Sequence, residues 1–492
     1  MESTVNTKRQ DISHGMPPPN KWAVLVTVMF GLFMVVLDFN IVTVALPAMM
    51  RSFRASEETV KLVVESYALS YAVFTLTGSW LRERIGIRPT FLAGLVIFTA
   101  ASLLCGLSWA LPSMIAFRII KGLGGGIMMP TGFTMMTESF PPNERGKAFG
   151  IFGMVIVFAP SIGPTLGGYL VDFLDWRFVF FINIPIGALV FALASRIMRD
   201  TRPLAPCRFD LAGFLSLGFS LACILAALNL VRGLGWTHSL NLVLFAVSAA
   251  AFAVFLVSAA RADCPIIQLN LFRNFHFSVL SFLNFYRAFI MFARIVLLPM
   301  MFQSVLGLSA FRTGLLLMPG AIASGLTMPA IGPFIDRYGP RWFIFWGFII
   351  QAAGSFMFYN IGPGTDTGYI VASMIIFGVG AGLLGTPVTS AAMNAAPRRY
   401  IGQVSIVLTV IMQVGQAFGV AVFGTTTVLR AAAHAHGAAA IPQAAWLAGY
   451  REAFIAMGVL SLLGLIPALG TFGIRPAPGN HHAQESLSVA AD

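Results

Sequence analysis

Apolar runs long enough to cross a bilayer follow one another along almost the whole chain. A helix spans the hydrocarbon core with about 20 apolar residues, and in lipid it also satisfies its own backbone hydrogen bonds. Charged residues make up only 10% of the chain, whereas a soluble domain carries about 25%. We therefore predict an all-α, polytopic membrane protein whose segments span the bilayer as helices.

The hydropathy pattern predicts fourteen spans, and an even number places both termini on one side. That side carries 19 of the 31 Lys and Arg residues, the opposite side carries 8 and the spans carry 4. By the positive-inside rule both termini are cytoplasmic, in the inner (plasma) membrane, and the net charge needs no nucleic-acid partner. The approximate spans are 22–47, 60–81, 89–109, 112–137, 147–171, 177–198, 209–231, 240–260, 277–303, 312–335, 341–361, 367–394, 402–429 and 452–474.

The second part of the chain repeats motifs of the first. The loop ERIGIR at 83–88 returns as DRYGPR at 336–341, 253 positions later, and the glycines of 122–126 return at 378–382, 256 positions later. Because the same loop is cytoplasmic in both halves, the repeats are parallel, as in transporters whose halves rock about a central site. The predicted organisation is a cytoplasmic tail (1–21), a six-helix half (22–200), two linker helices (201–275), a second six-helix half (276–475) and a cytoplasmic tail (476–492).

The loops are too short to hold a catalytic or nucleotide-binding domain. The chain contains no phosphate loop and no HExxH or Ser/His/Asp arrangement, so we predict neither an enzyme nor a cofactor. The four cysteines have no paired spacing, which predicts neither a metal site nor a disulfide framework. An ion gradient therefore suits this chain better than ATP as a driving force.

The stretch 150–187 combines an apolar run with glycine and proline at fixed steps. Gly163 and Gly167 lie four positions apart and share a helix face, which lets a neighbouring helix approach closely. Pro160 and Pro164 remove backbone donors and predict a bend in the same helix. The alternative is a tight helix crossing that has no gating role.

Five motifs together resemble those of a known family. They are LDFNIVTVALP at 37–47, SWLRERIGIR at 79–88, RIIKG at 118–122, APSIGPTLGG at 159–168 and WRFVFFINIPIG at 176–187. On these motifs the chain resembles the major facilitator superfamily and, within it, the fourteen-helix drug–proton antiporters of the EmrB/QacA type. Asn40 and Thr43 stand where that family usually has Thr and Asn, and Lys121 replaces a Gln.

The resemblance implies that Asp38 is the proton-coupling acid of the first helix and that Arg118 takes part in coupling. An ionised carboxyl in the middle of a span is costly, so its protonation depends strongly on its surroundings. Glu65 is a second candidate proton carrier, or a countercharge for a cationic drug. The alternatives are that Asp38 is a structural partner of an Arg or Asn and that Glu65 snorkels to a wet cavity mouth.

Four polar residues inside the spans are expected to line the substrate cavity: Asn40, Lys121, Arg287 and Arg294. Lys121 follows Arg118 by three positions on one helix face, from which it can pair with either acid. Arg287 and Arg294 are two helical turns apart and point the same way, unless they snorkel to an interface. Four basic and two acidic residues inside the spans do not favour a purely cationic substrate and leave lipophilic anions such as fatty acids open.

Charged loops at the cytoplasmic ends of the two halves are expected to act as latches. Acidic and basic side chains at helix ends can bridge two halves in one state and separate in another. Conformational roles are expected, in addition to those of the glycines and prolines above, for Glu83, Arg84, Gly86, Gly168, Asp336, Arg337 and Gly339.

The resemblance implies a secondary transporter that exports lipophilic compounds in exchange for protons by alternating access. The expected partners are a lipophilic small molecule, protons and the lipid bilayer, with a periplasmic adaptor protein as a further candidate. An exporter of one metabolite or fatty-acid-like anion is the alternative within transport, because the buried cations would favour it. A membrane sensor that binds a ligand without moving it is the alternative outside transport.

Overall fold

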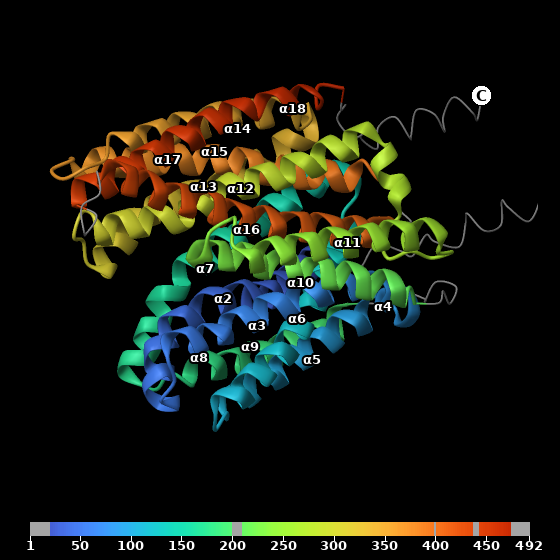
Figure 1. The fold of residues 1–492 in the computed structure, drawn as a ribbon. Helices are drawn as coiled ribbons and strands as arrows, with labels where there is room; N and C mark the ends of the chain where they lie inside the picture. Colours follow the sequence, from blue (N-terminus) through green and yellow to red (C-terminus); the bar gives the residue numbers. More distant parts are fainter. Residues whose placement is uncertain (1–19, 199–208, 398–399, 436–441, 474–492) are drawn as a thin grey trace, which may run out of the picture.

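The computed structural model describes residues 20–198, 209–397, 400–435 and 442–473, and all regular structure in these ranges is helical. Within them, 13 helices are long and apolar enough to span a membrane, and the bent helix α7 (Arg145–Phe173) brings the number to 14. Figure 1 shows them running side by side as two bundles. The predicted all-α, polytopic fold is thereby confirmed.

The first half consists of helices α2 to α9. The Asn20 side chain accepts hydrogen bonds from the backbone N–H groups of Trp22 and Ala23 and so starts the first of them. The second predicted span is one continuous path made of α3, a 3-10 turn and α4. The bounds are α2 (Lys21–Phe53), α3 (Glu57–Phe74), α4 (Gly78–Ile85), α5 (Ile87–Gly106), α6 (Leu111–Ser139), α7 (Arg145–Phe173), α8 (Phe178–Phe181) and α9 (Asn183–Ile197).

Two linker helices precede the second half. They pack on each other, and α10 also contacts α3 of the first half and α16 of the second, so this pair lies across the side of the molecule. The bounds are α10 (Leu211–Leu234), α11 (Ser239–Arg261), α12 (Phe275–Ser304), α13 (Ala310–Tyr338), α14 (Arg341–Tyr359), α15 (Thr367–Asn394), α16 (Ile401–His434), α17 (Gln443–Leu463) and α18 (Leu465–Leu469).

A glycine with positive φ follows the equivalent helix in each half. Gly86 (φ 93°) separates α4 from α5, and Gly339 (φ 81°) separates α13 from α14. A residue with a side chain is strained in this part of backbone space, which explains why glycine returns at this point of the repeat. The two repeated loops therefore share a backbone conformation as well as a sequence pattern.

Both described chain ends lie on one side of the molecule, which we call the terminus side. Lys21 forms an ion pair with Glu144 there, and the two halves are joined there by hydrogen bonds. Arg145 Nη1 donates to Asn394 Oδ1 (2.6 Å), and the hydroxyls of Thr134 and Ser405 lie 3.0 Å apart. These bonds close the terminus side.

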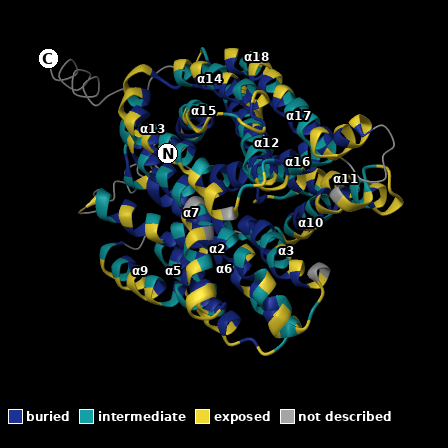
Figure 2. Cartoon of the chain, turned by 90° about the vertical axis from the view of Figure 1, so that its left-hand side faces the viewer, coloured by how far each residue is buried: buried dark blue, intermediate teal, exposed yellow. Residues whose placement is uncertain are grey.

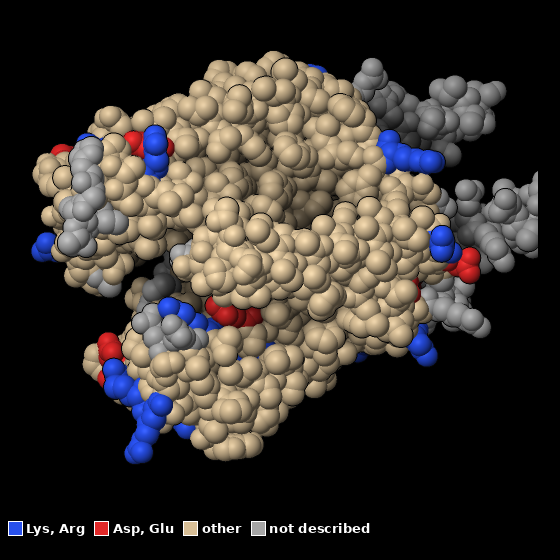
Figure 3. Space-filling view, in the orientation of Figure 1, with Lys and Arg blue, Asp and Glu red and all other residues tan. Residues whose placement is uncertain are grey.

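The halves separate toward the opposite side. Phe173, at the end of α7, is 74% exposed, and Phe311, at the start of α13, is 72% exposed. Figure 3 shows the surface hollowed between the two halves at this end. The structure is thus closed on the terminus side and open on the opposite side.

Glycines form the seam between α7 and α13 on the terminus side. A Cβ on Gly150 would lie 2.5 Å from the carbonyl oxygen of Met328 and 3.0 Å from Cα of Pro329, so backbone meets backbone there. Beyond the seam α7 bends, because Pro142–Pro160 and Thr165–Phe173 differ in direction by 40°. This bend agrees with the one that the prolines predict.

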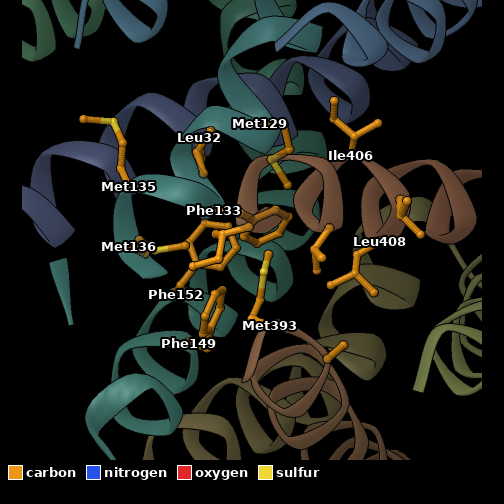
Figure 4. Packing of buried hydrophobic residues seen from close by; sticks show 14 of the residues in the cluster. Leu32, Met129, Phe133, Met135, Met136, Phe149, Phe152, Met393, Ile406 and Leu408 are labelled. Carbon is orange, nitrogen blue, oxygen red and sulfur yellow. The ribbon is translucent and has the colours of Figure 1, made fainter. Parts of the chain in front are cut away.

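Apolar side chains from both halves fill the space behind the seam. Figure 4 shows Phe133 of α6 and Phe152 of α7 beside Met393 of α15 and Leu408 of α16. The rings of Phe133 and Phe152 meet edge to face, with centroids 5.2 Å apart. Such an apolar plug stabilises the closed terminus side through apolar burial, which does not depend on direction and can form again in another packing.

The outer surface has the pattern of a membrane protein. In Figure 3 the Lys, Arg, Asp and Glu side chains gather near the two ends, and a broad belt between them is almost free of charge. Figure 2 shows exposed residues on the outer faces of the helices and buried ones toward the middle of each bundle. Among these spanning helices, the linker helix α11 is the least buried, because only 17% of the residues in its most apolar 18-residue stretch are buried.

Two details differ from the prediction. The last span begins at Gln443 and not near 452, so the loop before it is shorter and Arg451 lies inside α17. Cys264 is disulfide-bonded, a bond that the unpaired spacing of the cysteines does not indicate. Cys105 and Cys223 are buried, free thiols.

We expect Gly150→Ala to weaken the closed terminus side. The added methyl group meets backbone, so overpacking should cost about 1–3 kcal/mol in this state alone. If the closed side opens, the open side should close. Spin labels on Leu174 and Phe311, both exposed near the open end, should then lie closer together, as double electron–electron resonance measures. Gly168→Ala is the matched control on the same helix, because its Cβ would have nothing within 4 Å; equal distance distributions in both variants would contradict the seam's role.

Candidate functional site

A buried cluster of three charges lies inside the first half. The carboxylate of Asp38, on α2, accepts hydrogen bonds from Arg118 Nη1 at one oxygen and from Lys121 Nζ (2.5 Å) at the other. All three side chains are 0% exposed. The three-residue spacing puts both cations on one face of α6, as the sequence predicts, and that face meets α2.

Aromatic rings and a backbone carbonyl complete the cluster. Arg118 Nε donates to the carbonyl of Val63 on α3 (2.9 Å), and its guanidinium lies 4.1 Å from the ring centre of Tyr67. Lys121 Nζ lies 4.6 Å from the ring centre of Phe98. These contacts tie α2, α3, α5 and α6 together and favour positive charge through the ring faces.

The cluster has one more cation than anions, and Arg118 Nη2 is buried without a hydrogen-bond partner among the described residues. Adding a proton to Asp38 would remove the charge that holds both cations. Since the same carboxylate joins α2 to α6, proton binding and helix packing are physically linked there. Protonation of Asp38 can therefore change how the helices pack without any covalent reaction in the cluster.

The other candidates of the first half lie apart from this carboxylate. Glu65 is exposed on α3, so Lys121 pairs with Asp38 and not with Glu65. Asn40 donates to the carbonyl of Val36 (2.9 Å) and lies at the contact of α2 with α7. A Cβ on Gly163 would come within 2.9 Å of the Asn40 Cβ, which accounts for glycine at that position.

In the second half, Arg287 and Arg294 both point from α12 toward α15. Arg287 Nη2 donates to Asn284 Oδ1 (2.8 Å) and to Thr389 Oγ1 of α15 (3.5 Å). The Arg294 guanidinium lies 4.5 Å from the ring centre of Phe377, also on α15. The structure therefore brings the two predicted cavity arginines to one helix face, while Asn40 and Lys121 lie within the first half.

One predicted latch residue joins the halves. Asp336 of α13 accepts hydrogen bonds from the backbone N–H groups of Gly146 (2.8 Å) and Lys147 (3.1 Å). These groups open α7, where the helix dipole favours an anion. The partner is thus a helix start and not a basic side chain, a contact that carries no signal in the sequence.

Two of the remaining latch residues, Arg84 and Arg337, have local contacts. Arg84 lies 5.3 Å from the ring centre of Trp80, and Arg337 lies 5.2 Å from that of Tyr338. Sequence reasoning missed Arg82, which forms an ion pair with Glu138 (3.1 Å) and lies beside Gly402 of the other half. In the sequence, the position of Arg82 in a charged loop before a helix could have indicated this role.

We expect Asp38→Asn to destabilise the protein by about 3–5 kcal/mol, because it leaves two buried cations without an anion. Lys121→Gln should cost less, since Arg118 keeps its partner, and Asp38→Asn with Lys121→Gln should recover part of the loss. Thermal unfolding of the purified protein in detergent measures the stability of all three variants.

Glu452→Gln is the control, because it breaks the exposed pair with Arg430 and should cost under about 1 kcal/mol. If Asp38→Asn lost no more stability than this control, the buried cluster would not be held by the charge of Asp38.

Comparison with known proteins identifies the family to which this chain belongs. The sequence profile of the Major Facilitator Superfamily matches residues 28–420. The Multidrug resistance protein Stp of Mycobacterium tuberculosis is 30% identical over 402 residues, covering 82% of this chain and 75% of that protein. The Tetracenomycin C resistance and export protein of Streptomyces glaucescens is 30% identical over 404 residues, with the same two coverages.

A solved structure has the same fold. The human organic anion transporter MFSD10 superposes with a TM-score of 0.67 over 92% of this chain and 100% of that chain, at 15% sequence identity. At this identity the likeness concerns the fold alone. On the profile match and the curated relatives, the chain belongs to the major facilitator superfamily.

Proposed function

We propose that this protein is a proton-coupled antiporter that exports lipophilic compounds, of the fourteen-helix drug–proton type. The observation that carries the proposal is the buried cluster of Asp38, Arg118 and Lys121. An acid that holds two helices together through its charge gives a proton a way to change the packing of those helices. The names of the curated relatives, among them a multidrug resistance protein and a tetracenomycin C export protein, agree with such a substrate range.

The open and closed sides support an alternating-access cycle. If the terminus side is cytoplasmic, as the positive-inside rule predicts, the present state is open to the outside of an inner membrane. The bonds at Asp336 and Arg145 close the cytoplasmic side in this state and would break in the inward-open one. Polar and apolar contacts on one side then replace those on the other, with the two halves moving as bodies.

The first experiment measures proton flux driven by substrate. Purified protein is placed in liposomes with an imposed proton gradient and a trapped pH-sensitive dye, and tetraphenylphosphonium is added as a lipophilic cation. We expect the wild-type protein to move protons when the compound is added. We expect Lys121→Gln to keep this flux, because Arg118 still holds Asp38 and Gln is the residue usual in the family that the chain resembles.

The variant with both Asp38→Asn and Lys121→Gln separates structure from coupling. If Asp38 carries the proton, this variant folds with much of its stability restored and still moves no protons. If Asp38 serves only as a partner for Lys121, removing both charges restores the flux and the coupling role is refuted. Substrate binding by the wild-type protein without any proton movement would refute antiport itself.

A further inference from the structure

The second half holds two cations that have no anion of their own. Arg287 and Arg294 are the basic residues within α12, and neither takes part in an ion pair among the described residues. From residue 275 to residue 473 the sequence contains three acidic residues, Asp336, Asp366 and Glu452. The first caps α7, the second caps α15 and the third pairs with Arg430, so all three are already engaged.

These arginines cannot reach water at the membrane surface. Arg287 is twelve residues from the start of α12 and Arg294 is ten residues from its end. At a rise of about 1.5 Å per residue, those stretches are about 18 Å and about 15 Å long, well beyond the reach of an arginine side chain. Snorkelling therefore does not explain them.

Both guanidinium groups face the interior of the protein and remain incompletely satisfied. They point toward α15, where they meet Thr389 and Phe377. The Nε atoms of both are buried and have no hydrogen-bond partner among the described residues, yet each side chain keeps part of its surface open. Buried, unpaired donors with positive charge are the groups that a carboxylate would satisfy.

The first half shows how this fold neutralises such charges. Lys121 directly precedes Gly122, and Phe377 directly precedes Gly378, its counterpart in the repeat. In the first half the cation at this place shares Asp38 with Arg118, whereas in the second half a ring lies under Arg294 and no acid is near. At this place the second half thus has a ring instead of a cation, and its two buried cations lie on α12 without an acid beside them.

The position of Arg287 connects the pair with the contact between the halves. A Cβ on Gly385 would lie near both Arg287 Nη1 (3.9 Å) and the Met328 methyl group (2.8 Å). Met328 is also the residue that meets Gly150 and Gly153 of α7 at the seam. Arg287 therefore lies where the seam begins, and Arg294 lies two helical turns further toward the open side.

We propose that Arg287 and Arg294 bind the anionic head of a single-chain amphiphile, such as a fatty-acid-like carboxylate, that enters from the space between the halves. The proposal rests on the proposed function and adds an anionic class to its lipophilic substrates. The two side chains start two helical turns apart on α12, so their guanidinium groups must turn from Thr389 and Phe377 toward each other to hold the head together. Phe377 and Met328 then offer apolar surface to the chain. An arginine fork matches a carboxylate in geometry and charge, and its neutral ester lacks both.

Equilibrium binding tests this without any gradient. Purified protein in phosphatidylcholine nanodiscs is titrated with 11-(dansylamino)undecanoic acid and with its methyl ester, and the dansyl fluorescence is followed. We expect the acid to bind and the ester to bind at least about tenfold more weakly, the loss expected from one charge-assisted hydrogen bond. Equal binding of acid and ester would overturn the proposal.

Single substitutions locate the site. Arg287→Gln and Arg294→Gln should each weaken binding of the acid about tenfold or more, and Arg294→Lys should keep part of the affinity because the charge remains. Arg273→Gln is the matched control, since Arg273 is exposed before α12. Both Gln variants binding within twofold of the wild type would overturn the site. Size-exclusion profiles equal to the wild type show that the variants are folded.

Two further measurements show whether a lipid head group occupies the site and whether the anion site or the antiport proposal fails. Nanodiscs that contain phosphatidylglycerol should leave the affinity unchanged, and competition by this lipid would overturn the single-chain assignment in favour of a lipid head group. Tetraphenylphosphonium-driven proton flux with no binding of the acid would refute the anion site and leave antiport standing. Binding of the acid with no proton flux for any compound would refute antiport and leave the anion site standing.

Discussion

A charge buried away from water must be matched by an opposite charge or by donors and acceptors, and this constraint governs the interior of the protein. In the first half the constraint is met internally, because Asp38 lies between Arg118 and Lys121 and every one of the three is fully buried. The cluster therefore fixes the packing of α2 against α6. Its strength also makes it sensitive, since a single proton changes the charge on which that packing depends.

The second requirement is that the two halves can part. The seam between α7 and α13 is built from glycines and from the apolar plug around Phe133, contacts that need close approach but little directional bonding. Directional bonds at the seam are few and lie at helix ends, as with Asp336 and the start of α7. Such an interface closes tightly and can still open as a unit, as alternating access requires.

The sequence predicted the helices and the membrane character well, because apolar length and the lack of charge are local properties. It also singled out Asp38, Arg118, Lys121, Arg287 and Arg294 as candidates, since charged residues inside spans are rare. Pairing was harder, because the choice between Asp38 and Glu65 as partner of Lys121 depends on how α2 and α3 are rotated against α6. The cap on α7 by Asp336 and the disulfide of Cys264 depend on tertiary placement alone, so no local pattern predicted them.

The two charged regions are joined by a continuous line of packed contacts. Asn40 follows Asp38 by two residues on α2 and touches α7 at Gly163; further along α7, Gly150 meets Met328, which lies beside Gly385 and Arg287. A shift of α2 on protonation would press on the same helix that forms the seam, and a ligand at Arg287 would press on the seam from the other half. Under the proposed function both events would act on one element, the α7–α13 contact, and this shared contact would couple two sites that never touch.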